Sequence, residues 1–143
     1  PRSDIDILST FSWNEGDFDP DGDGPNPDVP LSTLDVSPWK FTTNARWTLS
    51  EALSFNAQLL VVGDRDRAFD ENIDLYEIEG YETLDVGLDW QVLQGLLSVQ
   101  LTNALDSTFI TPTSQTYVGN PIFAPRVAGA QGRALSFAYS IRF

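Results

Sequence analysis

The chain has 143 residues, enough for one domain with a core, and a formal net charge of -13 from 8 Lys plus Arg against 21 Asp plus Glu. Such an acidic chain repels phosphate backbones, so no nucleic acid is expected as a partner. Cys and His are both absent, which excludes disulfides, zinc or haem ligation by these side chains, and Ser-His or Cys-His nucleophile sets, so we expect no enzyme.

A membrane-spanning helix is not expected, because no stretch reaches the roughly 18 to 20 consecutive apolar residues that it needs. Any crossing of a membrane would therefore use a β-barrel. The chain begins at Pro1 without a signal-peptide pattern, so we expect a mature protein or a piece of a longer one.

Apolar and polar residues alternate with a period of two in six segments, which predicts six strands with two unlike faces. The last segment is the clearest, because Leu135, Phe137 and Tyr139 alternate with small or polar residues. In the fourth segment, Asp85 and Asp89 share the polar face, more than about 12 Å apart, which is too far for an acid and base pair. In chain order the segments are 4–13, 40–49, 52–61, 82–91, 96–103 and 134–143.

The connections between these segments differ in length. Short turns are expected near Ser50-Glu51 and Leu93-Gln94-Gly95, whereas 14–38, 64–80 and 106–132 are long and rich in Gly, Pro, Asp and Asn. Short turns at one rim and long loops at the other are typical of transmembrane β-barrels, in which strands of about ten residues match an apolar band of about 25 Å. The sequence therefore predicts an all-β antiparallel meander of about six strands, with long extracellular loops and short periplasmic turns.

Alternation alone does not tell whether the apolar face meets lipid or a closed core. A soluble, lipocalin-like ligand-binding β-barrel is therefore the alternative, and the asymmetry of the connections favours the membrane barrel. Aromatic residues near the strand ends fit an interfacial girdle, although ordinary core packing explains them equally well. These residues are Trp13, Trp39, Trp47, Trp90, Tyr139 and Phe143.

Several stretches in order resemble the C-terminal region of TonB-dependent outer-membrane siderophore receptors. They are Ser37-Pro38-Trp39-Lys40, the GDRDRAF stretch 63–69, the GYETLD stretch 80–85, the LTNALD stretch 101–106, Gly132-Arg133, and the final strand that ends at the aromatic Phe143.

The resemblance implies a bacterial outer-membrane location and a barrel of about 22 strands that is plugged by an N-terminal domain. Residues 1–143 would be its C-terminal segment, without the plug, and would take part in TonB-dependent transport of a ferric siderophore. The implied partners are outer-membrane lipid and lipopolysaccharide, the remainder of the barrel and the plug, and the TonB system. An accessory or structural fragment within a larger membrane assembly is a further alternative.

Within this family, the 63–69 stretch and the loop 113–117 look most like receptors for hydroxamate siderophores such as aerobactin or ferrichrome. The guanidinium groups of Arg65 and Arg67 could bind an anionic ferric siderophore or a lipopolysaccharide phosphate. Mutual pairing with Asp64, Asp66 and Asp70 is the favoured explanation of these arginines. Loop aromatics at a membrane boundary likewise need no ligand. The candidate ligand-binding residues are Arg65, Arg67, Gln115, Tyr117, Phe123 and Arg126.

The first long connection contains a D-x-D-x-D-G pattern that is typical of calcium loops. Alternate carboxylates converge on a hard cation, and Gly22 permits the sharp turn. A solvated acidic loop is the alternative, because Pro20 interrupts the pattern and no helices flank it. The candidate calcium ligands are Asp17, Asp19, Asp21, Asp23 and Asp28.

Overall fold

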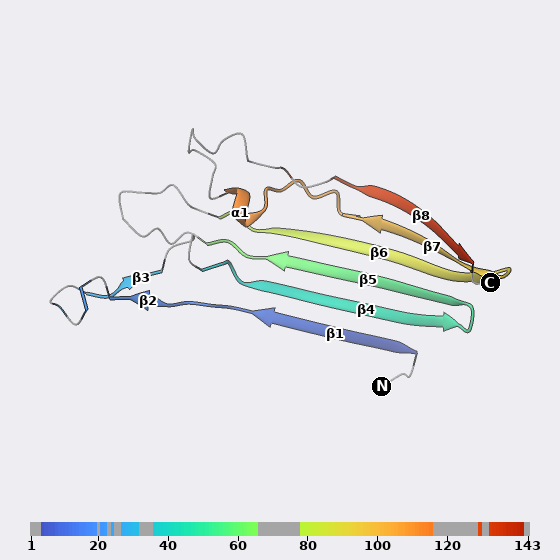
Figure 1. Ribbon diagram of the computed structural model, residues 1–143, viewed down its shortest axis with the longest axis horizontal. Helices are drawn as coiled ribbons and strands as arrows, with labels where there is room; N and C mark the ends of the chain where they lie inside the picture. Colours follow the sequence, from blue (N-terminus) through green and yellow to red (C-terminus); the bar gives the residue numbers. More distant parts are fainter. Residues whose placement is uncertain are drawn as a thin grey trace.

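The computed structural model describes residues 4–19, 21, 22, 24, 27–31, 36–65, 78–115, 129 and 132–141. Most of them belong to one antiparallel sheet (Figure 1). Its strands are β1 (Ile5–Ser12), β4 (Lys40–Ser50), β5 (Leu53–Val62), β6 (Tyr81–Val92), β7 (Gly95–Thr102) and β8 (Ala134–Ile141). The first long connection adds the short hairpin β2 (Asp17–Phe18) and β3 (Val29–Pro30), and the last adds the helix α1 (Pro112–Gln115).

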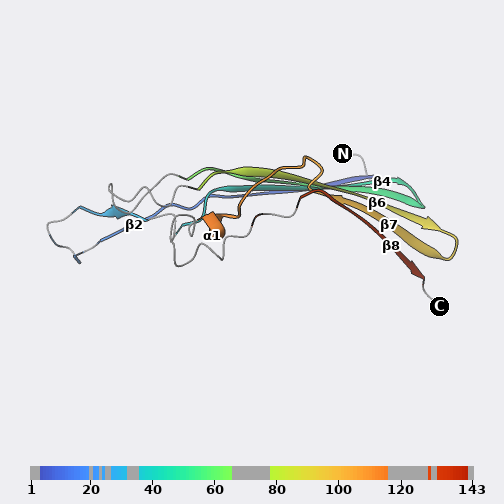
Figure 2. The same ribbon diagram turned by 90° about the horizontal axis from the view of Figure 1, so that it is seen from above.

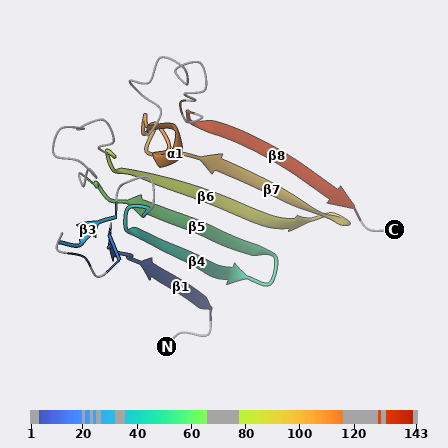
Figure 3. The same cartoon turned by 60° about the vertical axis from the view of Figure 1, so that its left-hand side comes forward.

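The six long strands form a meander in the order β1-β4-β5-β6-β7-β8, and every neighbouring pair is antiparallel. Each strand overlaps the segment that its alternation predicts, so the all-β class and the six-strand meander are confirmed. The sheet is not closed, and β1 and β8 are its two edges (Figure 3). The β2–β3 hairpin and α1 were not predicted, because neither carries a periodic pattern.

Strand pairing places most of the apolar residues of the six strands on one face, whereas Leu8, Leu60 and Leu96 lie on the other. Residues paired across antiparallel strands point to the same side of a sheet, and their neighbours in sequence point to the other. One apolar row runs Ile5, Trp47, Phe55, Leu88, Val99, Phe137, and the next runs Ile7, Ala45, Ala57, Val86, Leu101, Leu135. The polar row between them runs Asp6, Arg46, Asn56, Gly87, Gln100, Ser136.

Nothing in the described part of the chain covers the apolar face. Seen from its edge, the strands form a single curved layer (Figure 2). Ile7 is 69% exposed and Phe137 is 68% exposed. The buried apolar side chains among the described residues are Val36, Val62 and Ile78, and they lie at or beyond the ends of β4, β5 and β6 that the long connections join. The sheet therefore has no core of its own.

The two short turns lie together at the opposite rim of the sheet. Glu51 and Ala52 join β4 to β5, and Leu93 and Gln94 join β6 to β7. Leu93 has a φ of 56° and is 94% exposed. A leucine in this left-handed region is strained, because its Cβ approaches the following carbonyl oxygen. None of the described helical residues belongs to a helix long and apolar enough to span a membrane.

Replacing Leu93 with glycine should remove this strain at no cost in packing, since the side chain contacts almost nothing. We expect Leu93→Gly to raise the free energy of unfolding by about 1 kcal/mol, measured by urea unfolding. The matched change Gln94→Gly, at a neighbour without a positive φ, should lower it by a similar amount. Equal effects of the two changes would contradict the strain at Leu93.

Candidate functional site

The long connections meet at one end of the sheet, which we call the loop end: residues 27–31, 36–39, 63–65, 78–80 and 104–115. Backbone bonds hold it together. Gly63 N donates to Trp39 O at 3.0 Å, and Leu31 N donates to Gly16 O at 2.8 Å. Beyond the end of β5, Arg65 and Ile78 exchange both backbone bonds, at 2.9 and 2.7 Å. The sheet thus extends as a single bridge into the second connection.

Arg65, a predicted ligand-binding residue, lies inside this loop end and not on its surface. Its side chain is 9% exposed. One guanidinium nitrogen, Nη2, donates to Leu31 O at 3.2 Å, so Arg65 links the second connection to the first. Its Nε is buried without a hydrogen-bond partner. The neighbouring carboxylate of Asp64 accepts from Gly80 N at 2.6 Å and forms no ion pair with Arg65. The other pairings predicted in this stretch involve Arg67, Asp66 and Asp70, which lie outside the described residues.

Gln115, a second predicted ligand-binding residue, also ties two connections together. Its Oε1 accepts from Glu79 N at 2.8 Å. Its Nε2 donates to Glu79 O and to Ile110 O, both at 2.8 Å. The side-chain amide therefore mimics one residue of an adjacent strand. Tyr81 and Phe109 stack beside these segments with ring centroids 3.9 Å apart and planes 9° from parallel.

The acidic loop between β2 and β3 is described only in part. Asp19 Oδ1 accepts from Asp21 N at 2.9 Å and from Gly22 N at 2.8 Å, and Gly22 has a φ of 63°. Asp19 thereby stabilises the sharp turn that the calcium pattern also requires. Asp17 lies in β2, and Asp28 directly precedes β3. Among the described residues, no group of three or more carboxylates is arranged to hold a metal ion.

Several predicted site residues fall outside the described part of the chain. The ligand-binding candidates among them are Arg67, Tyr117, Phe123 and Arg126, and the calcium candidate is Asp23.

The polar face of the sheet contains a shallow trough with a volume of about 380 Å³, which we call the polar trough. Arg46 and Asp6 face each other across β1 and β4 in this trough, and the hydrogen bond of the Arg46 side chain goes to Ser54 Oγ at 3.5 Å. The other polar side chains that line it are Asn44, Asn56, Gln58, Asp85 and Gln100. Hydrogen-bonding groups of both kinds thus cover this face.

Asp85 and Asp89 in β6 both serve as hydrogen-bond acceptors within the sheet. Asp89 Oδ1 accepts from Ser98 Oγ at 2.6 Å, and Asp85 Oδ1 accepts from Asn103 N at 2.8 Å. Their side chains bond to different parts of β7 and its end. They are structural carboxylates that suit a wet polar face.

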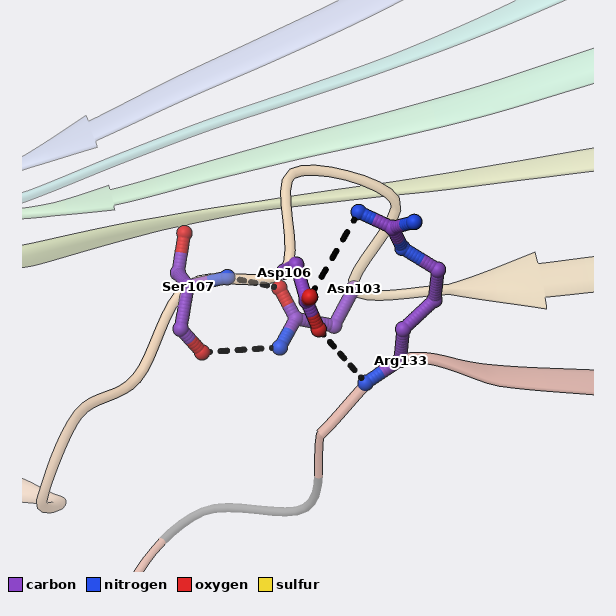
Figure 4. Close-up of polar contacts among 4 residues, drawn as sticks. All are labelled: Asn103, Asp106, Ser107 and Arg133. Carbon is purple, nitrogen blue, oxygen red and sulfur yellow. Dashed lines mark hydrogen bonds and ion pairs between the residues drawn. The ribbon is translucent and has the colours of Figure 1, made fainter.

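The end of β7 carries a set of contacts that the sequence did not predict, although the stretches 101–106 and 132–133 were singled out by resemblance (Figure 4). Asn103 is 5% exposed and has a φ of 49°. Its Oδ1 accepts from Ser107 N and its Nδ2 donates to Ser107 O, both at 2.9 Å. The Asn103 carbonyl accepts from Asp106 N at 2.8 Å. Asn and Asp are the non-glycine residues that best tolerate the left-handed region. The residue types at positions 103 and 106 were therefore the sequence signal for this turn.

Asp106 joins this turn to the start of β8. With a φ of 59°, it accepts from Arg133 N at 3.4 Å and pairs with the Arg133 guanidinium at 3.7 Å. This exposed ion pair is worth little by itself. Together with the Asn103 turn, it holds the two ends of the connection 106–132 beside each other. We call the set Asn103, Asp106, Ser107 and Arg133 the β7–β8 clasp.

No known protein family, no curated protein and no solved structure matches this chain.

Truncation of Asn103 should be costly, because it leaves two backbone groups of Ser107 without partners and puts an alanine at a positive φ. We expect Asn103→Ala to lower the free energy of unfolding by about 2 to 3 kcal/mol, measured by urea unfolding. Asn103→Gly, which tolerates the φ, should recover only about 1 kcal/mol of this. Asn44→Ala on the exposed polar face should change it by about 0.5 kcal/mol at most. A neutral Asn103→Ala would contradict the clasp.

The Gln115 bonds should be visible in hydrogen exchange. In Gln115→Leu, the Glu79 amide loses its acceptor, so we expect its exchange to become about tenfold faster. Gln91 lies at the opposite rim of the sheet, so the control Gln91→Leu should leave the exchange rate of the Glu79 amide unchanged. Unaltered exchange at Glu79 in Gln115→Leu would show that the contact does not hold the two connections together.

Proposed function

We propose that this chain forms the C-terminal strands and outer connections of a transmembrane β-barrel, within a TonB-dependent receptor that imports a ferric siderophore across the bacterial outer membrane. The observation that carries the proposal is the continuous, uncovered apolar face that six strands share in register. Contiguous apolar patches of more than a few hundred Å² on a soluble protein mark an interaction surface. A bilayer supplies the matching environment for a face of this extent.

The opposite face supports the same assignment. It bears the polar trough, and its carboxylates and amides form hydrogen bonds that suit water. Outer-membrane barrels alternate apolar residues toward lipid with polar residues toward the lumen. In the proposed barrel the polar trough therefore lines the interior, where the plug would contact it.

Aromatic side chains support a membrane boundary at each end of the strands. Near the short turns, Trp47 Nε1 donates to Asp4 Oδ2 at 3.2 Å and Tyr139 OH donates to Val92 O at 3.3 Å. Their rings thus remain on the apolar face while their polar atoms reach the rim, as interfacial aromatics do. At the loop end, Phe11 and Trp39 lie with ring centroids 6.1 Å apart.

The spacing between these two aromatic groups fits a bilayer. Trp39 directly precedes β4 and Trp47 lies within it, eight positions further along the chain. Eight positions correspond to about 27 Å along a strand. A moderate tilt reduces this length toward the apolar band of about 25 Å that outer-membrane barrels present.

The open edges indicate that further strands complete the barrel. Edge strands in a bilayer would leave backbone N–H and C=O groups without partners, at a cost of several kcal/mol per group. β1 and β8 must therefore pair with strands from the rest of the same polypeptide or from another one. The import of a ferric siderophore and the coupling to TonB rest on the resemblance of the sequence stretches described above.

The orientation of the two faces can be tested directly, because the chain contains no native Cys. Nitroxide labels at Phe137→Cys and Ala138→Cys, adjacent in β8, should differ in the full polypeptide in lipid vesicles. We expect oxygen to relax the Phe137 label and a water-soluble nickel chelate to relax the Ala138 label, measured by power-saturation EPR. A soluble, lipocalin-like barrel would instead protect the Phe137 label from both relaxants, and that result would overturn the membrane assignment.

Transport can be tested in cells that depend on the full polypeptide for iron. We expect its deletion to abolish uptake of radioactive iron from at least one hydroxamate siderophore, and uptake in the parent strain to require TonB. Normal uptake from a panel of hydroxamate and carboxylate siderophores in the deletion strain would contradict the proposed transport.

A further inference from the structure

Arg65 is a buried cation without a counter-ion in the described part of the chain. It is 9% exposed, and its Nε has no hydrogen-bond partner. The ion pair found among the described residues is Asp106 with Arg133, at the base of another connection. A buried guanidinium is costly unless an opposite charge and hydrogen bonds compensate it. Among the described residues, therefore, no opposite charge compensates the Arg65 guanidinium.

The position of Arg65 is fixed from several sides. Its backbone is held by the two bonds to Ile78, which is fully buried. Its Nη2 is held by the carbonyl of Leu31, whose own amide is bonded to Gly16. The guanidinium is therefore preorganised at the junction of the first two connections. A fixed, dehydrated guanidinium binds an incoming anion without the loss of side-chain entropy that a surface arginine would suffer.

Asp64 is the described carboxylate nearest to Arg65 in sequence, and it does not pair with the Arg65 guanidinium. Asp64 Oδ1 accepts from the Gly80 amide, and this bond closes the base of the second connection. The neutral Leu31 carbonyl satisfies one N–H group but contributes no charge. No described residue offers the guanidinium a negatively charged oxygen, and the planar fork of arginine matches two oxygens of one oxyanion.

We infer that Arg65 is the anchor of an oxyanion-binding site at the loop end, and that it selects carboxylate-bearing ligands over neutral ones. The inference deepens the proposed function and rests on it in one respect, because the carboxylate would belong to the ferric siderophore. The negative charge of the bound anion faces the guanidinium, for which no described residue supplies a counter-ion. A free inorganic oxyanion could bind Arg65 through the same contacts. The test therefore distinguishes a siderophore carboxylate from a free inorganic oxyanion.

The first arm of the test uses sulfate as the probe, with the full polypeptide in detergent and sodium chloride at matched ionic strength. We expect saturable sulfate binding by calorimetry, and we expect Arg65→Gln to weaken it about tenfold or more. If Arg65→Gln does not fold, Arg65→Lys replaces it in the test. Lysine keeps the charge but loses the planar fork, so this variant should also bind sulfate more weakly than the parent. Arg133→Gln, which removes an exposed arginine, should bind like the parent. Absence of sulfate binding, or equal binding by the Arg65 variants, would overturn the inference.

A second arm identifies the source of the anion. A ferric hydroxamate siderophore with free carboxylates should displace sulfate, whereas a neutral ferric trihydroxamate should not. Equal displacement by both would overturn the selectivity. If neither displaces sulfate while the Arg65 dependence persists, the oxyanion site stands and the proposed siderophore ligand fails, so the two failures are distinguishable.

Discussion

The pairing register of the six strands is the constraint on which the rest of the structure depends. Because side chains alternate along a strand, a slip of one residue would exchange the two faces of that strand. A slip in β4 would carry Arg46 to the apolar face and Trp47 to the polar trough. The short turns fix the register of two strand pairs, and the β7–β8 clasp brings the ends of a much longer connection together. Both faces, and the function proposed for them, follow from this alignment.

Little of the chain's own material stabilises the sheet from either side. Its buried apolar residues in the described part are confined to the loop end, and the strands are held mainly by their hydrogen-bond ladders. At the loop end, polar side chains replace a core by bonding to backbone groups of other connections. Gln115 does this for Glu79, Arg65 for Leu31 and Asp64 for Gly80. These bonds hold the described parts of the connections together.

The strands could be predicted from sequence because alternation is local, and β8 is the plainest example. The linking side chains could not, since Gln115 and Glu79 are 36 positions apart and no periodicity relates them. Arg65 and Gln115 were identified by residue type as ligand-binding candidates. The structure adds that both are already engaged with the backbone, and that only Arg65 retains an unused buried donor. Polar residues in loops carry the same sequence signal whether they bind a ligand or a carbonyl.

The even number of strands in the meander has a geometric consequence. With six strands alternating in direction, the outward edges of β1 and β8 run opposite to each other. A cylinder in which every pair of neighbouring strands is antiparallel contains an even number of strands, so in the proposed barrel the remaining strands are also even in number. The same parity requires that the two strands pairing with β1 and β8 in that barrel also run opposite to each other.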